Sequence, residues 1–439
     1  MNQKWNNPSG FPENLPQEQI LEEHLKKLMR ETYESFGYVP LETPAVEYLG
    51  ALTGHGEVTK EVYAIARAAA EGEGKEDDRG LRFDLTVPLA RYVAQHYGEL
   101  SFPFKRYQIQ KVWRGERPQK GRFREFYQAD IDVIGNENLP LHFDAEVVAV
   151  MHSLITKMSL GNFTIHINHR KLLQGLLQAN GIAPEQMESA LRFIDKFDKV
   201  GHEATVTSFV QELGLTPEQA ENLLAPLSQS IPIQELHSYL QTLPGEDILM
   251  EEGKHELGLI ADFLSPVSSA VGKIVFNPRI ARGLGYYTGC VYETTLDGLE
   301  NYGSICSGGR YANLAERFTK KALPGVGISL GLSRLFSIIK AEKLLSMEQK
   351  TRTQVLIALF EESQRFTANS AAQTLREMGI AAEVYHDGSH NLGRQIKQAD
   401  DRGIPHLLLL EEDGGFTLKN LAAHTQERIV SLEEITKLI

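Results

Sequence analysis

Two segments of the chain, residues 106–114 and 124–134, alternate between two kinds of side chain with a period of two. Successive side chains of a β-strand point to opposite faces of a sheet, so this period predicts two strands. One face of the pair would carry Arg106, Gln108, Gln110, Arg114, Arg124, Phe126, Gln128, Asp130 and Asp132. The intervening GERPQKGRF supplies glycine and proline for a long hairpin loop.

The polar face of this predicted hairpin has two interpretations. A two-stranded edge with a solvated face would explain the charges but not Phe126 among them. A binding platform explains both, because arginine is a planar donor suited to phosphate and a phenyl ring can stack on a base. On such a platform Gln128 and Asp132 would hold an ammonium group and a polar substrate head.

Length and local patterns predict more than one domain in the 439 residues. Residues 1–340 would form the first domain, with a helical insertion at about 170–265, followed by a linker at 341–351. Helical periodicity is clear at 16–37 and 143–158, and 163–168 reads as a strand. Residues 352–439 alternate between strands and helices (364–378, 391–402 and a last helix from Ser431), which is typical of a small α/β domain. The expected class is therefore α/β (α+β).

The charge of the chain is acidic overall and basic in one place. It has 45 Lys and Arg against 58 Asp and Glu, which argues against a general coating of nucleic acid. Yet KVWRGERPQKGRFRE, residues 111–125, holds six Lys or Arg against two Glu. The platform and its loop would therefore meet an anion.

Several other classes of protein are disfavoured. Cys290 and Cys306 fit neither a disulfide framework nor a zinc pattern, so reduced thiols are expected. No run approaches a membrane span, and a soluble, cytoplasmic protein is expected. The chain has no P-loop, no dinucleotide-binding glycine pattern and no nucleophile elbow. A nucleotide site would therefore be built from side chains on a sheet.

The run WRGERPQKGRFREFYQADIDVIG resembles motif 2 of class II aminoacyl-tRNA synthetases, in the form typical of histidyl-tRNA synthetases. PRIARGLGYYTGCVYE and LRFDLTVPLARY resemble the histidine-specific motif and the histidine and ATP loop of that family. GYVPLETPAVE resembles motif 1, and GVGISLGLSRLF resembles motif 3. The resemblance spans almost the whole chain in order.

The resemblance implies a class II catalytic domain with a mixed, mainly antiparallel sheet, a helical insertion and a C-terminal α/β anticodon-binding domain. It implies that L-histidine reacts with ATP to give histidyl-adenylate and pyrophosphate, and that histidine then passes to the 3′ end of tRNA(His). Mg²⁺ would be bound with ATP, with no metal site in the protein itself. A homodimer without membrane attachment is also implied.

Residue by residue, the resemblance implies roles in four groups. The ATP-binding residues would be Arg114 at the α-phosphate, Glu116 at the adenine amino group, Arg122, Phe126 under the base, and Arg334. The histidine-binding residues would be Asp84, Leu85, Thr86, Arg114, Gln128, Asp132, Arg282, Tyr286 and Tyr287. The catalytic residues would be Arg282, placed against the α-phosphate, and Arg114. Arg117, Gln119 and Lys120 would meet the tRNA acceptor stem, and Arg124 is expected to join them.

Some positions leave alternatives open. Asp84 and Thr86 could only cap the next helix, Glu116 could only pair with Arg117, and Gly308 with Gly309 could form a tight turn instead of a close approach to substrate. Gly285, Ala312 and Ser333 depart from the usual family pattern, which puts the packing of the pocket in doubt.

Two rival functions stay in view. One is a catalytically silent paralogue, such as the regulatory subunit of the first histidine-biosynthesis enzyme. The other is a synthetase for another amino acid, such as a prolyl or threonyl enzyme. Retention of Arg114, Arg282 and Arg334, together with an intact last domain, favours the histidine enzyme.

Overall fold

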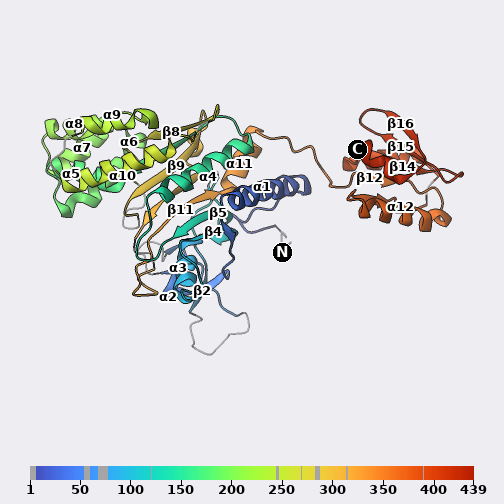
Figure 1. Cartoon of the computed structure of the whole chain (residues 1–439), viewed down its shortest axis with the longest axis horizontal. Helices are drawn as coiled ribbons and strands as arrows, with labels where there is room; N and C mark the ends of the chain where they lie inside the picture. The colour runs from blue at the N-terminus through green and yellow to red at the C-terminus, as the bar shows by residue number, and fades with distance from the viewer. Residues whose placement is uncertain are drawn as a thin grey trace, which may run out of the picture. The chain divides into compact units, whose positions relative to one another are not determined.

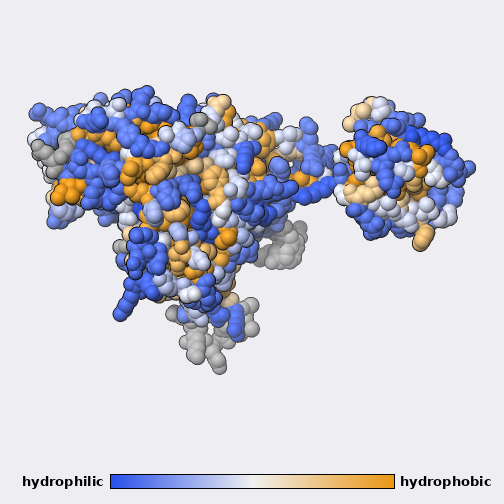
Figure 2. Space-filling model, viewed as in Figure 1, coloured by the Kyte–Doolittle hydropathy of each residue, from blue (hydrophilic) through white to orange (hydrophobic). Residues whose placement is uncertain are grey.

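The computed structural model describes residues 6–53, 60–67, 78–119, 121–243, 247–267, 269–281, 287–312, 315–388 and 390–439. These form two compact units: residues up to Pro12 with Leu25–Leu345, and Glu13–His24 with Ser346–Ile439. Among the residues described, no helix combines the length and apolarity needed to cross a membrane. On the face drawn in Figure 2, apolar residues gather in the middle of the first unit, and hydrophilic residues surround them.

The first unit is built on a sheet with nine strands in the order β1-β4-β5-β11-β10-β9-β6-β8-β7. Their bounds are β1 Val39–Pro40, β4 Phe104–Trp113, β5 Glu125–Ile134, β11 Gly325–Gly331, β10 Cys306–Tyr311, β9 Cys290–Leu296, β6 Phe163–His169, β8 Gly272–Phe276 and β7 Ile231–Pro232. Of the strand pairs described within this nine-stranded sheet, only β1–β4 and β6–β8 are parallel. The predicted mixed, mainly antiparallel sheet is confirmed. Two further strands, β2 Val46–Tyr48 and β3 Arg79–Leu81, form a separate antiparallel pair.

The predicted hairpin is the pair β4–β5, and it lies inside the sheet. β1 pairs with the free side of β4, and β11 pairs with the free side of β5. The register sets Arg106 opposite Asp132 and Gln110 opposite Gln128. Arg106, Gln128 and Asp132 are all buried. The interpretation as a solvated edge is therefore wrong, because the polar face is enclosed.

Helices cover the apolar face of the hairpin and pack along the sheet (Figure 1). α1, Pro16–Ser35, buries Leu25, Met29 and Tyr33, and the ring of Tyr33 lies 5.6 Å from that of Tyr107. The other helices of this part are α2 Leu49–Leu52, α3 Thr86–Gln95, α4 His142–Met158 and α11 Leu332–Glu342. α4 and α11 pack against β11 and β5. The predictions of helices at 16–37 and 143–158 and of a strand at 163–168 are confirmed within one or two residues.

In the described part of the stretch between β6 and β8, the chain forms six α-helices. They are α5 Arg170–Ala179, α6 Met187–Val200, α7 His202–Leu213, α8 Pro217–Leu224, α9 Leu236–Thr242 and α10 Ile248–Leu264. Figure 1 shows them gathered at one end of the sheet. The same stretch contributes β7, which pairs with β8 and was not predicted.

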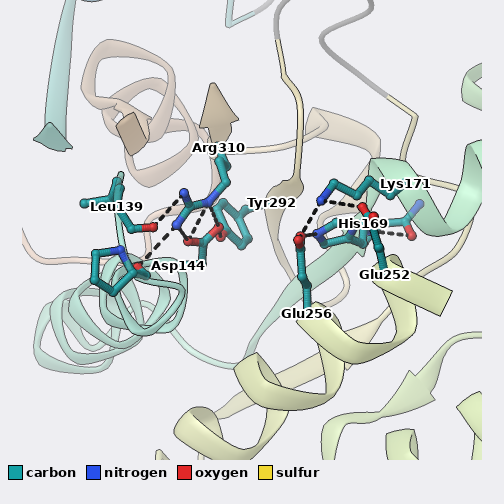
Figure 3. A network of polar contacts seen from close by, with 10 residues as sticks. Leu139, Asp144, His169, Lys171, Glu252, Glu256, Tyr292 and Arg310 are labelled. Carbon is teal, nitrogen blue, oxygen red and sulfur yellow. Dashed lines mark hydrogen bonds and ion pairs between the residues drawn. The ribbon is translucent and has the colours of Figure 1, made fainter. Parts of the chain in front are cut away.

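Two polar networks hold helices of this unit in place, one against the sheet and one against another helix (Figure 3). On β10, Nε of Arg310 donates to Asp144 of α4 over 2.9 Å, and the Tyr292 hydroxyl donates to the same carboxylate over 3.2 Å. At the start of α5, Nζ of Lys171 lies 2.6 Å from Glu256 and 3.1 Å from Glu252, both on α10. The second network therefore joins the first and last helices of the insertion.

The second unit has a five-stranded sheet in the order β13-β12-β14-β15-β16. Its elements are β12 Val355–Ile357, α12 Arg365–Glu377, β13 Ala382–Val384, α13 Leu392–Arg402, β14 His406–Leu410, β15 Phe416–Asn420, β16 Thr425–Ile429 and the 3-10 helix η7 Leu432–Lys437. The predictions of helices at 364–378 and 391–402 are confirmed. Sequence reasoning missed the β15–β16 hairpin, and the helix predicted from Ser431 is a 3-10 helix.

Candidate active site

Two cavities adjoin each other on the enclosed polar face of the sheet. The larger, of about 640 Å³, lies beside the loop between β4 and β5 and the start of α11. The smaller, of about 240 Å³, lies over β5, β10 and β11. Ser307 of β10 and Ser329 of β11 line both cavities. Two hydroxyl-bearing residues therefore form the wall where the cavities meet.

The larger cavity collects the predicted ATP-binding residues. Its lining includes all five of them, Arg114, Glu116, Arg122, Phe126 and Arg334, and also Gln128, which was predicted to bind histidine. The guanidinium carbon of Arg114 lies 4.3 Å from the ring centre of Phe83 and 5.2 Å from that of Phe126. Burial lowers the pKa of Arg114, while Asp84 and Glu116 oppose the shift, and an arginine stays protonated under such conditions. The cavity thus holds a fixed cation beside an aromatic face.

The loop over this cavity is held by its own side chains. Nη1 of Arg122 lies 3.4 Å from Glu116, so the expected alternative of a pair between Glu116 and Arg117 does not describe the structure. Nε and Nη1 of Arg124 donate to the backbone carbonyls of Glu116 and Ser9. Arg124 therefore fastens the loop.

Arg334 fastens the same loop from α11. Its Nε donates to the carbonyl of Gly121 over 3.3 Å, and its Nη1 donates to the carbonyl of Ser304 over 2.9 Å. One guanidinium thus joins Gly121 and Ser304, two residues of the cavity lining. Arg114 and Arg334 both line this cavity.

The smaller cavity is lined by acids and hydroxyls. Thr86, Asp130, Asp132, Tyr287 and Tyr311 are part of its lining. Nη2 of Arg106 lies 2.6 Å from the carboxylate of Asp132, and the Tyr311 hydroxyl donates to that carboxylate over 2.8 Å. Burial raises the pKa of Asp132 to about 6 and that of Asp130 to about 7, with Arg106 opposing both shifts. Two carboxyl groups therefore face one guanidinium, and the pocket favours a cation.

The loop before α3 brings the remaining predicted residues to this place. Oδ1 of Asp84 accepts from the amide of Val87 over 3.1 Å, so Asp84 does hydrogen-bond the first turn of the helix. It also interacts electrostatically with Arg114 and Asp132. Leu85 is fully buried, and its carbonyl accepts from Arg106 over 3.4 Å. Of this segment, Thr86 reaches the cavity lining.

Comparison with known proteins decides the family. Residues 10–335 match the family described as Histidyl-tRNA synthetase, and residues 354–439 match the family described as Anticodon binding domain. The chain belongs to the histidyl-tRNA synthetase family.

Similar proteins cover nearly the whole chain. A histidine–tRNA ligase of Thermobifida fusca is 42% identical, with 95% of each chain covered, and one of Cutibacterium acnes is 44% identical over 90% of this chain and 88% of its own. The crystal structure of histidyl-tRNA synthetase from Nostoc sp. PCC 7120 superposes with a TM-score of 0.89 at 36% identity, covering 99% of this chain and 100% of that one.

Glycines explain how the histidyl-tRNA synthetase motifs pack in this chain. Gly308 and Gly309 belong to strand β10, so the tight-turn alternative is wrong. A Cβ on Gly309 would lie 2.7 Å from Cδ1 of Tyr287, and a Cβ on Gly327 would overlap the carboxylate of Asp132. Bare backbone at these positions lets Tyr287 and Asp132 lie against the strands.

One departure from the family pattern has a structural role. Ser333, at the start of α11, accepts at Oγ from the backbone amide of Tyr127 in β5 over 2.9 Å. It thereby joins motif 3 to motif 2. Ala312 is exposed at the end of β10, and Gly285 lies outside the described residues.

Some predicted residues lie elsewhere, and some site residues were missed. Arg282, Tyr286 and Lys120 are outside the described residues. Arg117 and Gln119 are exposed on the loop. Sequence reasoning did not identify Tyr311, Ser304, Ser307 and Ser329. For Ser307, Tyr311 and Ser329 the available signal was their period-two placement within CSGGRY and GVGISLG, read beside the platform, whereas Ser304 lies outside both segments.

Proposed function

We propose that the larger cavity binds ATP, that the smaller one binds L-histidine, and that histidyl-adenylate forms where they meet. Histidine–tRNA ligation is the activity of the family, and the same site would pass histidine to the 3′ end of tRNA(His). The observation that carries the proposal is the wall of Ser307 and Ser329, which separates an arginine-lined cavity from an acid-lined one by two small side chains.

ATP would be held by charge and by stacking. Arg114, Arg122 and Arg334 supply cations for the phosphates, Phe126 supplies a ring face for adenine, and Glu116 would accept from the adenine amino group. Attack of a carboxylate on the α-phosphate brings two anions together, and fixed cations stabilise the charge that develops. Arg114, and Arg282 by resemblance, would serve at that phosphate.

Histidine would be held at both ends. Gln128 has a buried Oε1 without a partner among the described residues, and it would accept from the α-ammonium group together with Asp84 and Thr86. Asp132 and Tyr287 would bind the imidazole, with Tyr286 beside them and Leu85 contributing through its backbone. The negative balance of the pocket favours both cationic parts of the substrate.

Mg²⁺ would enter with ATP. The described residues contain no group of three or more His, Cys, Asp or Glu able to hold a metal ion, whereas Mg²⁺ commonly binds through one or two carboxylates plus substrate phosphates. The ion would be carried by the phosphates, and Glu116 is a carboxylate that lines the larger cavity. The ion would neutralise phosphate charge.

The rest of the chain would serve the tRNA. Arg117 and Gln119, which are exposed on the loop, would contact the acceptor stem together with Lys120. We assign 1–340 to the catalytic domain with its insertion at about 170–265, 341–351 to a linker, and 352–439 to anticodon binding. We propose a homodimer because exposed apolar residues could be covered by a second copy of the chain. Val39 of the edge strand β1 is 48% exposed, and Tyr48 of β2 is 65% exposed. A cytoplasmic location accompanies this assignment.

ATP–pyrophosphate exchange with each of the twenty amino acids tests the proposal. Exchange with histidine alone is expected. R114A and R282A should each reduce it by roughly 10²- to 10³-fold, as losing one preorganised donor does. Absence of exchange with every amino acid would instead support the silent paralogue, and exchange with another amino acid would support the second rival.

A further inference from the structure

Three polar side chains, Gln128, Ser329 and Asp130, lie in a row between the two cavities. Ser329 lies directly opposite Asp130 in the pairing of β11 with β5, and Gln128 lies on the same face of β5 two residues before Asp130. Nε2 of Gln128 donates to Oγ of Ser329 over 2.8 Å, and the Ser329 side chain faces Asp130, whose pKa its hydroxyl lowers. Of the residues described, none partners Oε1 of Gln128 or Oδ1 of Asp130.

The direction of donation along this row follows from the protons available. An ionised carboxylate only accepts, and a serine hydroxyl has one proton to donate. When the Ser329 proton is directed to the facing carboxylate of Asp130, the oxygen of Ser329 has to accept from Gln128, and only the NH₂ side of the amide can donate. Turning the amide over would set Oε1 against the Ser329 oxygen with no proton between them.

We propose that Asp130, acting through Ser329, is a positioning residue that holds the amide of Gln128 with Oε1 toward the amino-acid substrate. The inference rests on the proposed function, since the α-ammonium group of the substrate is the donor for Oε1. A carbonyl oxygen matches an ammonium group, which only donates, whereas an amide NH₂ in its place would oppose it. Asp130 thus differs from Asp132, whose carboxylate already has Arg106 and Tyr311 as partners.

The protonation state of Asp130 decides whether this direction is enforced. Burial raises its pKa to about 7; Arg106 of β4 opposes the shift, and Asp132 of β5 and Asp84 before α3 add to it. The other titratable or charged groups that interact with it are Tyr33, Arg114 and Tyr287. A protonated Asp130 can donate to Ser329, which frees the serine proton, and the amide of Gln128 is then no longer held one way round.

Serine variants give the first test. ATP–pyrophosphate exchange at pH 8 should show the KM for histidine raised about 10- to 100-fold in S329A, as expected for a weakened hydrogen bond to a charged group. The KM for ATP should change less than about threefold, which also reports that the variant is folded. S329T restores a hydroxyl on a strand position that accepts threonine, and its KM for histidine should return to within about threefold of wild type.

Asp130 itself is tested in combination. D130N should raise the KM for histidine, and adding D130N to S329A should change it less than about threefold, because residues acting through one another are not additive. The ratio of the KM for histidine in S329A to that in wild type should approach one at pH 6, where wild type loses the same orientation. The ratio cancels the titration of histidine and of Asp132.

The two hypotheses fail in different ways. A wild-type chain that shows no histidine-dependent exchange contradicts the proposed function. A wild type that does exchange, with an unchanged KM for histidine in S329A, overturns the positioning role of Asp130. A full-sized effect of D130N in the S329A background also overturns it, because Asp130 would then act on the substrate directly.

Discussion

The guanidinium of Arg106 lies 2.6 Å from the carboxylate of Asp132, and both side chains are buried beside the smaller cavity. Asp130 is buried on the same face, so Arg106 acts on two carboxyl groups. Removing one partner of a buried ion pair leaves an uncompensated charge, which costs more than the pair itself gains. The smaller cavity therefore depends on a residue that is not among its lining residues.

Replacing Arg106 by leucine should lower the free energy of unfolding by about 3–5 kcal/mol. Urea denaturation followed by Trp113 fluorescence in a W5F background measures it. Arg192→Leu is the control, because this arginine is 52% exposed in an i,i+4 pair with Glu188 and should lose about 0.5 kcal/mol or less. Equal losses in the two variants would contradict the burial argument.

The raised pKa values of Asp130 and Asp132 predict how stability changes with pH. An acid whose pKa is higher in the folded state binds its proton more tightly there, so its contribution is full below the unfolded pKa near 4 and is lost as pH rises through the folded pKa. With folded pKa values of about 7 and about 6, the contribution of these two groups to the free energy of unfolding of the ligand-free chain should fall by a few kcal/mol between about pH 4 and pH 7.

D130N separates this contribution from the others. Urea denaturation at several pH values should show a clearly shallower decline in D130N than in wild type, because one of the two titrating groups is gone. Glu256 does not contribute in this window: burial alone would raise its pKa, but His169 and Lys171 lower it to about 2. Identical pH profiles for D130N and wild type would show that other groups control the decline.

Lys171→Met should loosen the insertion without unfolding the sheet. It removes both ion pairs that join α5 to α10, with an expected loss of about 1 kcal/mol or less because the lysine is partly exposed. Chymotrypsin should then cleave faster within 170–265. Lys273→Met is the control, since Lys273 is 70% exposed and 3.6 Å from Asp297. Unchanged cleavage in K171M would mean that apolar packing alone holds the helices.

Arg117 and Arg124 should behave differently although they belong to one loop. R117A should leave ATP–pyrophosphate exchange near wild type, weaken tRNA binding, and reduce the slope of log K against log salt by about 0.7–0.9. R124A should impair exchange as well, since Arg124 fastens the loop to the carbonyls of Glu116 and Ser9. Loss of exchange in R117A would place that side chain in the ATP site instead.

The hairpin β4–β5 could be predicted from the sequence because its period of two is a local signal. The same signal placed Arg106, Gln128, Asp130 and Asp132 on one face, and the register confirms it. The partners of that face could not be predicted, since Ser329 lies 201 residues from Gln128 in the chain. Its place depends on which strand pairs with β5, and single-sequence patterns carry no information on that pairing.

Local signals also failed where composition was misleading. TQERI, the strand β16, is polar at four of its five positions and exposed along most of its length, so it lacks the alternation that marks a half-buried strand. It is a strand because β15 pairs with it. The enclosure of the platform was likewise invisible in the sequence, because β1 and β11 cover its two sides from distant parts of the chain.

The parallel pairing of β6 with β8 gives the helical insertion a topological role. β6 ends at His169 and β8 begins at Gly272, and two parallel neighbours require the chain to travel back along the sheet between them. The stretch that makes this return also supplies β7, which covers the outer side of β8. The helical insertion is thus the crossover connection between two parallel strands of the same sheet. A protein with a shortened insertion would still need a connection long enough to span the sheet.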